Sequence, residues 1–340
     1  MDVSLGLFPT ESPRRMVELI ALAESLGFGC VYVGDSQMIW REAFVVLGAA
    51  ALATSRIRLG PGVSNPVTRD PAVVAAGMAT LAELAGPRVV LGIGTGDSSL
   101  ETLGKRPASL ARLEAAVHLI RALLSGQQVA HPQSGAPARL TYVEPGPPPP
   151  TYVAVSSPRI HRLAGRVADG AIVLVGTDPA FLAASRRELE AGAAEAGRDL
   201  ARDGFRVVCW TPCSIQADGA AARAAVKAHV ARVLKRPLPF ELDPGFSARD
   251  LVAQIRDRYA YYEHMVPGTA HGEVVPDELV THFAVAGTPA EARDQLERLA
   301  ASGLVDEIAL VPHAQQPADR EQVVRQVGQM LASLGQAVPG

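Results

Sequence analysis

The amino-acid sequence predicts an α/β fold, namely a (β/α)8 TIM-like barrel with insertions. Eight short apolar segments alternate with longer amphipathic stretches rich in alanine, leucine, arginine and glutamate. This alternation is typical of parallel strands joined by right-handed helical crossovers. The apolar segments are hydrophobic almost throughout, as in strands that are buried on both faces. Because eight such units fit within 340 residues, a closed barrel is favoured over an open doubly wound sheet.

Each element has its own local signal. The apolar segments are predicted as strands over Val3–Phe8, Cys30–Gly34, Ile57–Val63, Arg88–Ile93, Tyr152–Val155, Ala171–Val175, Phe205–Ile215 and Glu307–Val311. The stretches between them are predicted as helices near 13–27, 42–54, 70–85, 107–125, 158–168, 178–196, 218–235, 288–302 and 319–334. Four helix starts carry a capping residue followed by proline, at Ser12-Pro13, Asp70-Pro71, Asp178-Pro179 and Thr288-Pro289.

We predict a single domain over residues 1–340, with insertions at about 126–150 and 236–282. The first insertion is rich in proline and glycine, whereas the second contains the aromatic run RDRYAYYEH and is predicted to carry short helices. Long insertions in a barrel often serve as substrate lids. An oligomer contact or a surface embellishment is an equal alternative for the second insertion.

Composition excludes several classes of protein. Lysine and arginine number 32 against 35 acidic residues, so the net charge of −3 leaves no broad basic surface for nucleic acid or for a membrane. No apolar run approaches the roughly 20 residues of a membrane span, and the N-terminal run has no basic flank of a signal peptide. Cys30, Cys209 and Cys213 are predicted to be buried free thiols. We therefore expect a cytoplasmic protein.

Polar residues directly after the strands are the candidates for a site, because the active site of such a barrel lies where its strands end. These positions are rich in glycine, serine, threonine, asparagine and aspartate, a composition that suits a polar, phosphorylated ligand. They are Asp35 and Trp40, Ser64 and Asn65, Gly94, Thr95, Gly96 and Asp97, Ser156 and Ser157, Gly176 and Thr177, and His313.

The role of each candidate stays open at this level. Asp35 and Asp97 can each be an acid, a base, a substrate clamp or a helix cap, and Trp40 can wall a cofactor or pack under its loop. The glycines from Gly92 to Gly96 do not form a dinucleotide fingerprint, because Asp97 stands where the third glycine is required. We expect no metal site, since the histidines lack ligand spacing.

Longer motifs carry a family resemblance. The stretch LGPGVSNPVTRDPAVVAAGMATLAEL followed by RVVLGIGTGDSSLETLG resembles the bacterial-luciferase-like superfamily of flavin-dependent oxidoreductases. Within that superfamily the chain is most similar to the coenzyme F420-dependent methylenetetrahydromethanopterin reductases. The resemblance continues through YVAVSSPRIHRLAGRVADGAIV, CWTPCSI and FAVAGTPAEARDQLERL, and so covers almost the whole chain. It implies the same barrel with a large insertion.

The resemblance also implies roles for the candidate residues. A non-proline cis peptide bond would press the backbone against the cofactor ring, and the matching bond is Gly62–Val63. The matching cofactor contacts are Asp35, Gly62, Val63, Ser64, Asn65, Gly94, Thr95, Gly96 and Asp97, with Ser156, Ser157, Gly176 and Thr177 at the phosphate and ribityl chain. Related F420-dependent sugar-phosphate and alcohol dehydrogenases have a histidine and a glutamate where this chain has Ser36 and Asp97. Alcohol oxidation through a histidine base therefore loses support. Asp97 becomes the first candidate to protonate or orient a substrate, beside Asp35 and Trp40.

The resemblance leads to one expected function and two alternatives. The expected function is hydride transfer from reduced F420 to a small unsaturated or iminium-type substrate. The first alternative is a monooxygenase that uses O2 and reduced FMN, which a separate flavin reductase supplies. The second is a non-catalytic flavin-binding barrel, whose polar pocket would be filled by its own side chains. A homodimer formed through the helices next to the second and third strands is expected in each case.

Overall fold

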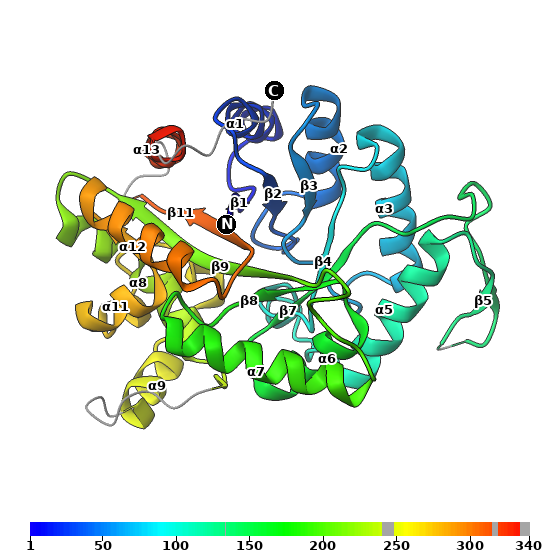
Figure 1. Ribbon diagram of the computed structural model, residues 1–340. Coiled ribbons are helices and arrows are strands. Elements are labelled where there is room, and N and C mark those ends of the chain that lie inside the picture. The colour runs from blue at the N-terminus through cyan, green and yellow to red at the C-terminus, as the bar shows by residue number, and fades with distance from the viewer. Residues whose placement is uncertain (133, 240–247, 315–318, 334–340) are drawn as a thin grey trace.

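The computed structural model describes residues 1–132, 134–239, 248–314 and 319–333 and has the predicted barrel architecture (Figure 1). Its parallel sheet has the strand order β3-β2-β1-β11-β9-β8-β7-β4. These eight strands are β1 (Asp2–Leu7), β2 (Cys30–Val33), β3 (Arg58–Pro61), β4 (Leu91–Ile93), β7 (Thr151–Val155), β8 (Gly170–Val173), β9 (Arg206–Ile215) and β11 (Glu307–Pro312). All eight predicted strands are confirmed.

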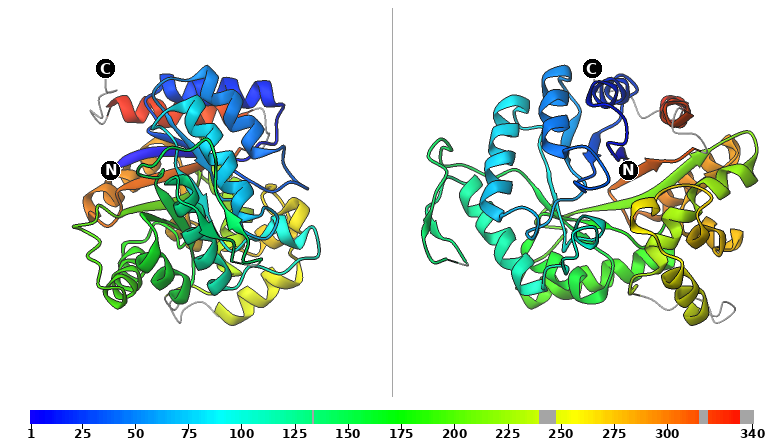
Figure 2. Two further views of the ribbon diagram at one scale, coloured as in Figure 1. Left: turned by 90° about the vertical axis from the view of Figure 1, so that its right-hand side faces the viewer. Right: turned by 180° about the vertical axis from the view of Figure 1, so that it is seen from behind.

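Helices surround the sheet, as the two further views in Figure 2 show. The main ones are α1 (Pro13–Ser25), α2 (Ala43–Ala53), α3 (Pro71–Ala85), α5 (Leu110–Leu124), α6 (Pro158–Val167), α7 (Pro179–Glu195), α8 (Gly219–Leu234), α12 (Pro289–Ser302) and α13 (Arg320–Ser333). The predicted helix starts are confirmed, since Ser12, Asp70, Asp178 and Thr288 each cap their helix with a side-chain oxygen. No helix in the described ranges is both long and apolar enough to cross a membrane.

The two insertions differ in their regular structure. The first contains a short hairpin of β5 (Val129–Ala130) and β6 (Pro137–Ala138). The described part of the second carries the predicted short helices, which are α9 (Ala248–Asp257), the 3-10 turn η1 (Tyr261–Glu263), α10 (Ala270–Glu273) and α11 (Asp277–Phe283). Residues 240–247 of this insertion lie outside the described residues. An additional strand, β10 (Val285–Gly287), pairs in parallel with β9, and its three residues are too short to give a sequence signal.

A buried charged group closes the amino-terminal end of the barrel. The Glu307 side chain at the start of β11 is fully buried, and it accepts hydrogen bonds from the Tyr32 hydroxyl at 3.0 Å and from Arg58 at 2.7 Å. Burial is the main cause that raises the pKa of Tyr32 well above its usual value. Because Tyr32 stays neutral, its hydroxyl can donate to the Glu307 carboxylate.

The three cysteines are buried and free, as predicted.

The barrel closes where the loop after β3 meets β4. The Ser64 N–H donates to the Gly92 carbonyl at 3.0 Å, and the Gly94 N–H donates to the Ser64 carbonyl at 2.9 Å. The two segments approach so closely that a Cβ at position 92 would lie 2.3 Å from the Pro61 carbonyl oxygen. We call this contact between the loop after β3 and strand β4 the seam. It requires glycine at position 92, because backbone atoms cannot move aside as a flexible side chain can.

We expect Gly92→Ala to destabilise the protein by about 2–3 kcal/mol, since the added methyl group overpacks the seam. Thermal unfolding followed by circular dichroism measures the change as a lower Tm. Gly146→Ala is the matched control, because a Cβ at position 146 meets no atom within 4 Å. An unchanged Tm in Gly92→Ala would show that the seam can relax.

Candidate active site

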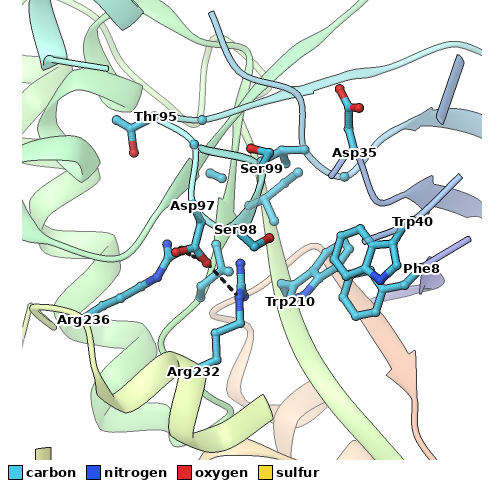
Figure 3. Close-up of a pocket in the computed structure, with 17 residues that line it drawn as sticks. Phe8, Asp35, Trp40, Thr95, Asp97, Ser98, Ser99, Trp210, Arg232 and Arg236 are labelled. Atoms are coloured by element: carbon cyan, nitrogen blue, oxygen red, sulfur yellow. Dashed lines mark hydrogen bonds and ion pairs between the residues drawn. The ribbon is translucent and has the colours of Figure 1, made fainter. Parts of the chain in front are cut away.

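A pocket lies at the carboxyl ends of the strands, where the sequence places the candidate residues (Figure 3). Loops after β1, β2, β3 and β4 form one part of its wall, and residues of β7, β8, β9 and α8 form the rest. The lining residues are Phe8, Asp35, Trp40, Gly62, Val63, Gly94, Thr95, Gly96, Asp97, Ser98, Ser99, Ala154, Ile172, Leu174, Trp210, Arg232 and Arg236. Eight of the predicted site residues are among them.

The peptide bond between Gly62 and Val63 is cis, as the resemblance implies. It lies at the end of β3, and both residues are on the pocket wall. Position 62 has no room for a side chain, because a Cβ there would lie 2.6 Å from the Cβ of Tyr32 and 3.0 Å from the ring of Trp210. Close packing against the barrel interior thus fixes the backbone that presents Val63 to the pocket.

The rest of the wall is largely apolar. Val63, Ala154 and Ile172 lie along one part of it, and a Cβ at Gly94 would lie 3.3 Å from both Val63 and Ala154. Elsewhere on the wall the rings of Phe8 and Trp40 stack with centroids 4.3 Å apart and planes only 10° from parallel. The sequence leaves open whether Trp40 lines a pocket or packs under its loop. In the structure it packs on Phe8 and also lines the pocket. Such walls suit a flat, largely apolar ligand.

Asp35 joins the loop after β2 to the loop after β3. Its carboxylate accepts two hydrogen bonds from the Arg69 guanidinium, at 2.9 and 3.0 Å, and one from the Ser64 hydroxyl at 2.9 Å. Arg69 also pairs with Glu42. Because a bidentate arginine contact stabilises the charged carboxylate, Asp35 is placed as an anchored anion on the wall.

Ser64 and Asn65 are buried behind the wall and do not line the pocket. The Asn65 amide donates to the Thr68 hydroxyl at 2.9 Å and to the Ser99 hydroxyl at 3.1 Å, and its oxygen accepts the Thr68 N–H. Asn65 thus joins the loop after β3 to the loop after β4. In this arrangement Ser64 and Asn65 position the wall, whereas the resemblance implies direct contact with a cofactor.

Asp97 meets three cations at the end of α8. The nearest atoms are Arg232 Nε at 3.1 Å and Arg236 Nη2 at 2.5 Å, both from Oδ2, while Lys235 Nζ lies 3.8 Å from Oδ1. Burial alone would raise the pKa of Asp97, but the three positive charges outweigh it and hold this pKa well below the usual carboxyl range. Asp97 is therefore ionised at neutral pH, a state that does not fit the expected role of proton donor.

The remaining candidates lie away from the wall. Ser156, Ser157, Gly176 and Thr177 are not among the described residues that line the pocket. Thr177 directs both its N–H, at 2.8 Å, and its hydroxyl, at 3.4 Å, to the carbonyl of His282. His313 is buried and forms a 3.0 Å hydrogen bond with His229. Burial lowers the pKa of His313 to about 3.

Sequence reasoning missed Arg232 and Arg236, along with Phe8 and Trp210. The two arginines and Lys235 are spaced so that they share one face of a helix. The available signal was this group of three cations at the end of the alanine-rich helix α8. Such a pattern is typical of a solvated helix face, so it does not by itself indicate a site.

Comparisons with known proteins agree with the fold. The family model described as luciferase-like monooxygenase matches residues 3–306. The chain is 29% identical to the 5,10-methylenetetrahydromethanopterin reductase of Archaeoglobus fulgidus over 321 residues, which cover 92% of this chain and 94% of that protein. It is 39% identical to the F420-dependent glucose-6-phosphate dehydrogenase of Beutenbergia cavernae over 206 residues, covering 56% and 61% of the two chains.

Solved structures extend the comparison. The coenzyme F420-dependent tetrahydromethanopterin reductase of Methanopyrus kandleri aligns with a TM-score of 0.74 at 25% identity, covering 98% of this chain and 99% of that one. The EDTA monooxygenase of Chelativorans aligns with a TM-score of 0.70 at 16% identity, covering 100% and 96%, and shares the fold. Because the family model matches most of the sequence, this chain belongs to the luciferase-like monooxygenase family of oxidoreductases.

Proposed function

We propose that this chain is a reductase that binds coenzyme F420 in the pocket and reduces a small unsaturated or iminium-type substrate. The observation that carries the proposal is the pocket wall, where Val63, Ala154 and Ile172 present an apolar surface beside the glycine loop that contains Gly94 and Gly96. The similarity to a methylenetetrahydromethanopterin reductase over nearly the whole chain supports this choice.

The residues of the pocket fit a deazaflavin. Val63, Ala154 and Ile172 would hold the apolar face of its ring, while Thr95 and Asp35 offer polar atoms at the edge. The phosphate-bearing chain would run towards the N-terminus of α6, where the Ser157 side chain caps no backbone N–H. The free N–H groups at a helix N-terminus favour an anion. When bound, reduced F420 supplies a hydride from its ring.

The chain's own residues would orient the substrate and exclude water. The stacked pair Phe8 and Trp40 shields one part of the pocket, and the apolar wall lowers the local dielectric. An ionised Asp97 cannot give a proton to the substrate. An iminium carbon needs only a hydride, whereas reduction of an enone also needs a proton. Asp97 is therefore assigned to substrate orientation, and the iminium class is favoured.

The two alternatives differ in their support. Solved monooxygenases share the fold at 16–19% identity, which leaves an FMN-dependent reaction as an outcome that binding must decide. A non-catalytic barrel would bind a flavin stoichiometrically but show no turnover over a broad panel of substrates, which an activity assay distinguishes from the proposed reductase.

We further propose a homodimer formed through α2 and α3. Large apolar side chains on these helices are strongly exposed, with relative exposures of 64% for Val45, 75% for Leu52 and 57% for Val73. Val45 and Val73 border a groove between the two helices. An exposed apolar patch of this kind is typical of a surface that binds a second copy.

The first prediction concerns the cofactor. We expect F420 to bind with a Kd in the micromolar range or tighter and FMN to bind more weakly, in both oxidation states. Fluorescence titration of the purified protein measures both constants. A preference for reduced FMN would support the monooxygenase instead, and binding of neither cofactor would contradict the proposal.

The second prediction tests the position of the ring. Ala154→Leu would extend a side chain into the pocket and should weaken F420 binding at least tenfold, about 1.4 kcal/mol, with little change in Tm. Ala301→Leu, on an exposed position of α12, is the control and should bind F420 as the unaltered protein does. Equal affinity in the two variants would place the ring elsewhere.

The third prediction concerns the dimer. Sedimentation should give twice the chain mass of 35.6 kDa, and Val73→Arg should give the monomer, because a charge on the apolar face cannot be buried cheaply. Val266→Arg changes a residue with 49% exposure in the second insertion and should leave the dimer intact. A dimer that survives Val73→Arg would argue for another interface.

A further inference from the structure

The end of α8 brings more positive charge to the pocket than its acidic neighbours balance. Arg232, Lys235 and Arg236 all lie within 4 Å of the Asp97 carboxylate. Glu101 is a further carboxylate that acts on Lys235, so three cations face two acidic groups. In Figure 3, Arg232 and Arg236 converge on Asp97 from the α8 side, away from Asp35.

These cations are largely removed from water. The side chains of Arg232, Lys235 and Arg236 are only 14%, 10% and 23% exposed. Lys235 Nζ has no hydrogen-bond acceptor among the described residues and lies 3.6 Å from the ring centre of Tyr259. Burial lowers the pKa of Lys235 to about 8, although the neighbouring Asp97 opposes the shift. Excess buried positive charge is unfavourable for folding, and such arrangements concentrate at functional sites.

The excess charge is accessible from the pocket. Arg232 and Arg236 line it together with Asp97. Each guanidinium carries five N–H donors, of which Asp97 engages only part. Arginine suits carboxylate and phosphate groups in particular, because its planar donors match two oxygens at once.

We infer that the substrate of this pocket carries an anionic group, a carboxylate or a phosphate, that binds Arg232 and Arg236. This inference rests on the proposed function for the reaction, but the anion site itself follows from the residues of α8. Asp97 occupies part of the site and competes with the incoming anion. Lys235 adds long-range attraction from behind the two arginines.

The test uses three small aromatic probes of similar shape, which are benzoate, phenyl phosphate and the neutral benzamide. Their affinities are measured by ligand-observed NMR, with and without saturating F420. We expect at least one anion to bind about tenfold more tightly than benzamide to the F420-loaded protein, in line with one charge-assisted hydrogen bond. Benzoate and phenyl phosphate distinguish a carboxylate site from a phosphate site.

Variants connect the preference to the two arginines. Arg232→Gln and Arg236→Gln should each reduce the preference for the anion, whereas Arg298→Gln on the exposed face of α12 should keep it. Arg236→Lys retains the charge and should keep part of the preference, which separates a lost anion site from a misfolded protein. Asp97→Asn removes the competing carboxylate and should tighten anion binding, an effect that a purely structural ion pair would not give.

Several results would overturn the inference. They are equal affinity for benzamide and both anions, a preference that survives loss of both arginines, and weaker anion binding in Asp97→Asn. Anions that bind only in the absence of F420 and displace it would assign the arginines to the cofactor's phosphate instead. If F420 does not bind but the anion preference persists in the cofactor-free protein and depends on Arg236, the proposed function fails while the anion site stands.

Discussion

The close approach of β3 and β4 is the constraint on which the rest of the site depends. The backbone hydrogen bonds from Ser64 to Gly92 and from Gly94 to Ser64 close the barrel. They also bring the cis bond at Gly62–Val63 next to the glycine loop after β4, so that both become one wall. A side chain at position 92 would separate the two segments. The contact that closes the barrel therefore also forms this wall of the pocket.

Side chains then fix the loops above this seam. Asp35 binds Arg69 and Ser64, and Asn65 binds Ser99, so the loops that follow β2, β3 and β4 are joined in series. Each of these groups is held by hydrogen bonds inside the protein, which makes it a support for the wall. Rigid support of this kind lets a pocket position a ligand without reorganisation when it binds.

The sequence predicts the strands, the helices and about half of the residues that line the pocket, because these depend on local periodicity and on the rule that strand ends form the site. It does not predict the charge state of Asp97. That state depends on Arg232, which is 135 residues away along the chain and lies on a helix with an ordinary cationic face. Likewise, the burial of Ser64 and Asn65 behind the wall follows from their partners and leaves no trace in residue type.

The charges around Asp97 bear on both the reacting group and the remainder of the proposed substrate. The arginines that attract an anion are the same groups that keep Asp97 ionised. An ionised Asp97 does not supply a proton, so within the proposed reaction we favour an acceptor that needs a hydride alone. An iminium carbon meets that requirement, and a carboxylate or phosphate elsewhere on the same molecule would balance the excess charge of α8. In these proposals a single cluster of side chains, Asp97 with Arg232 and Arg236, bears on both the reacting carbon and the anionic group of the substrate.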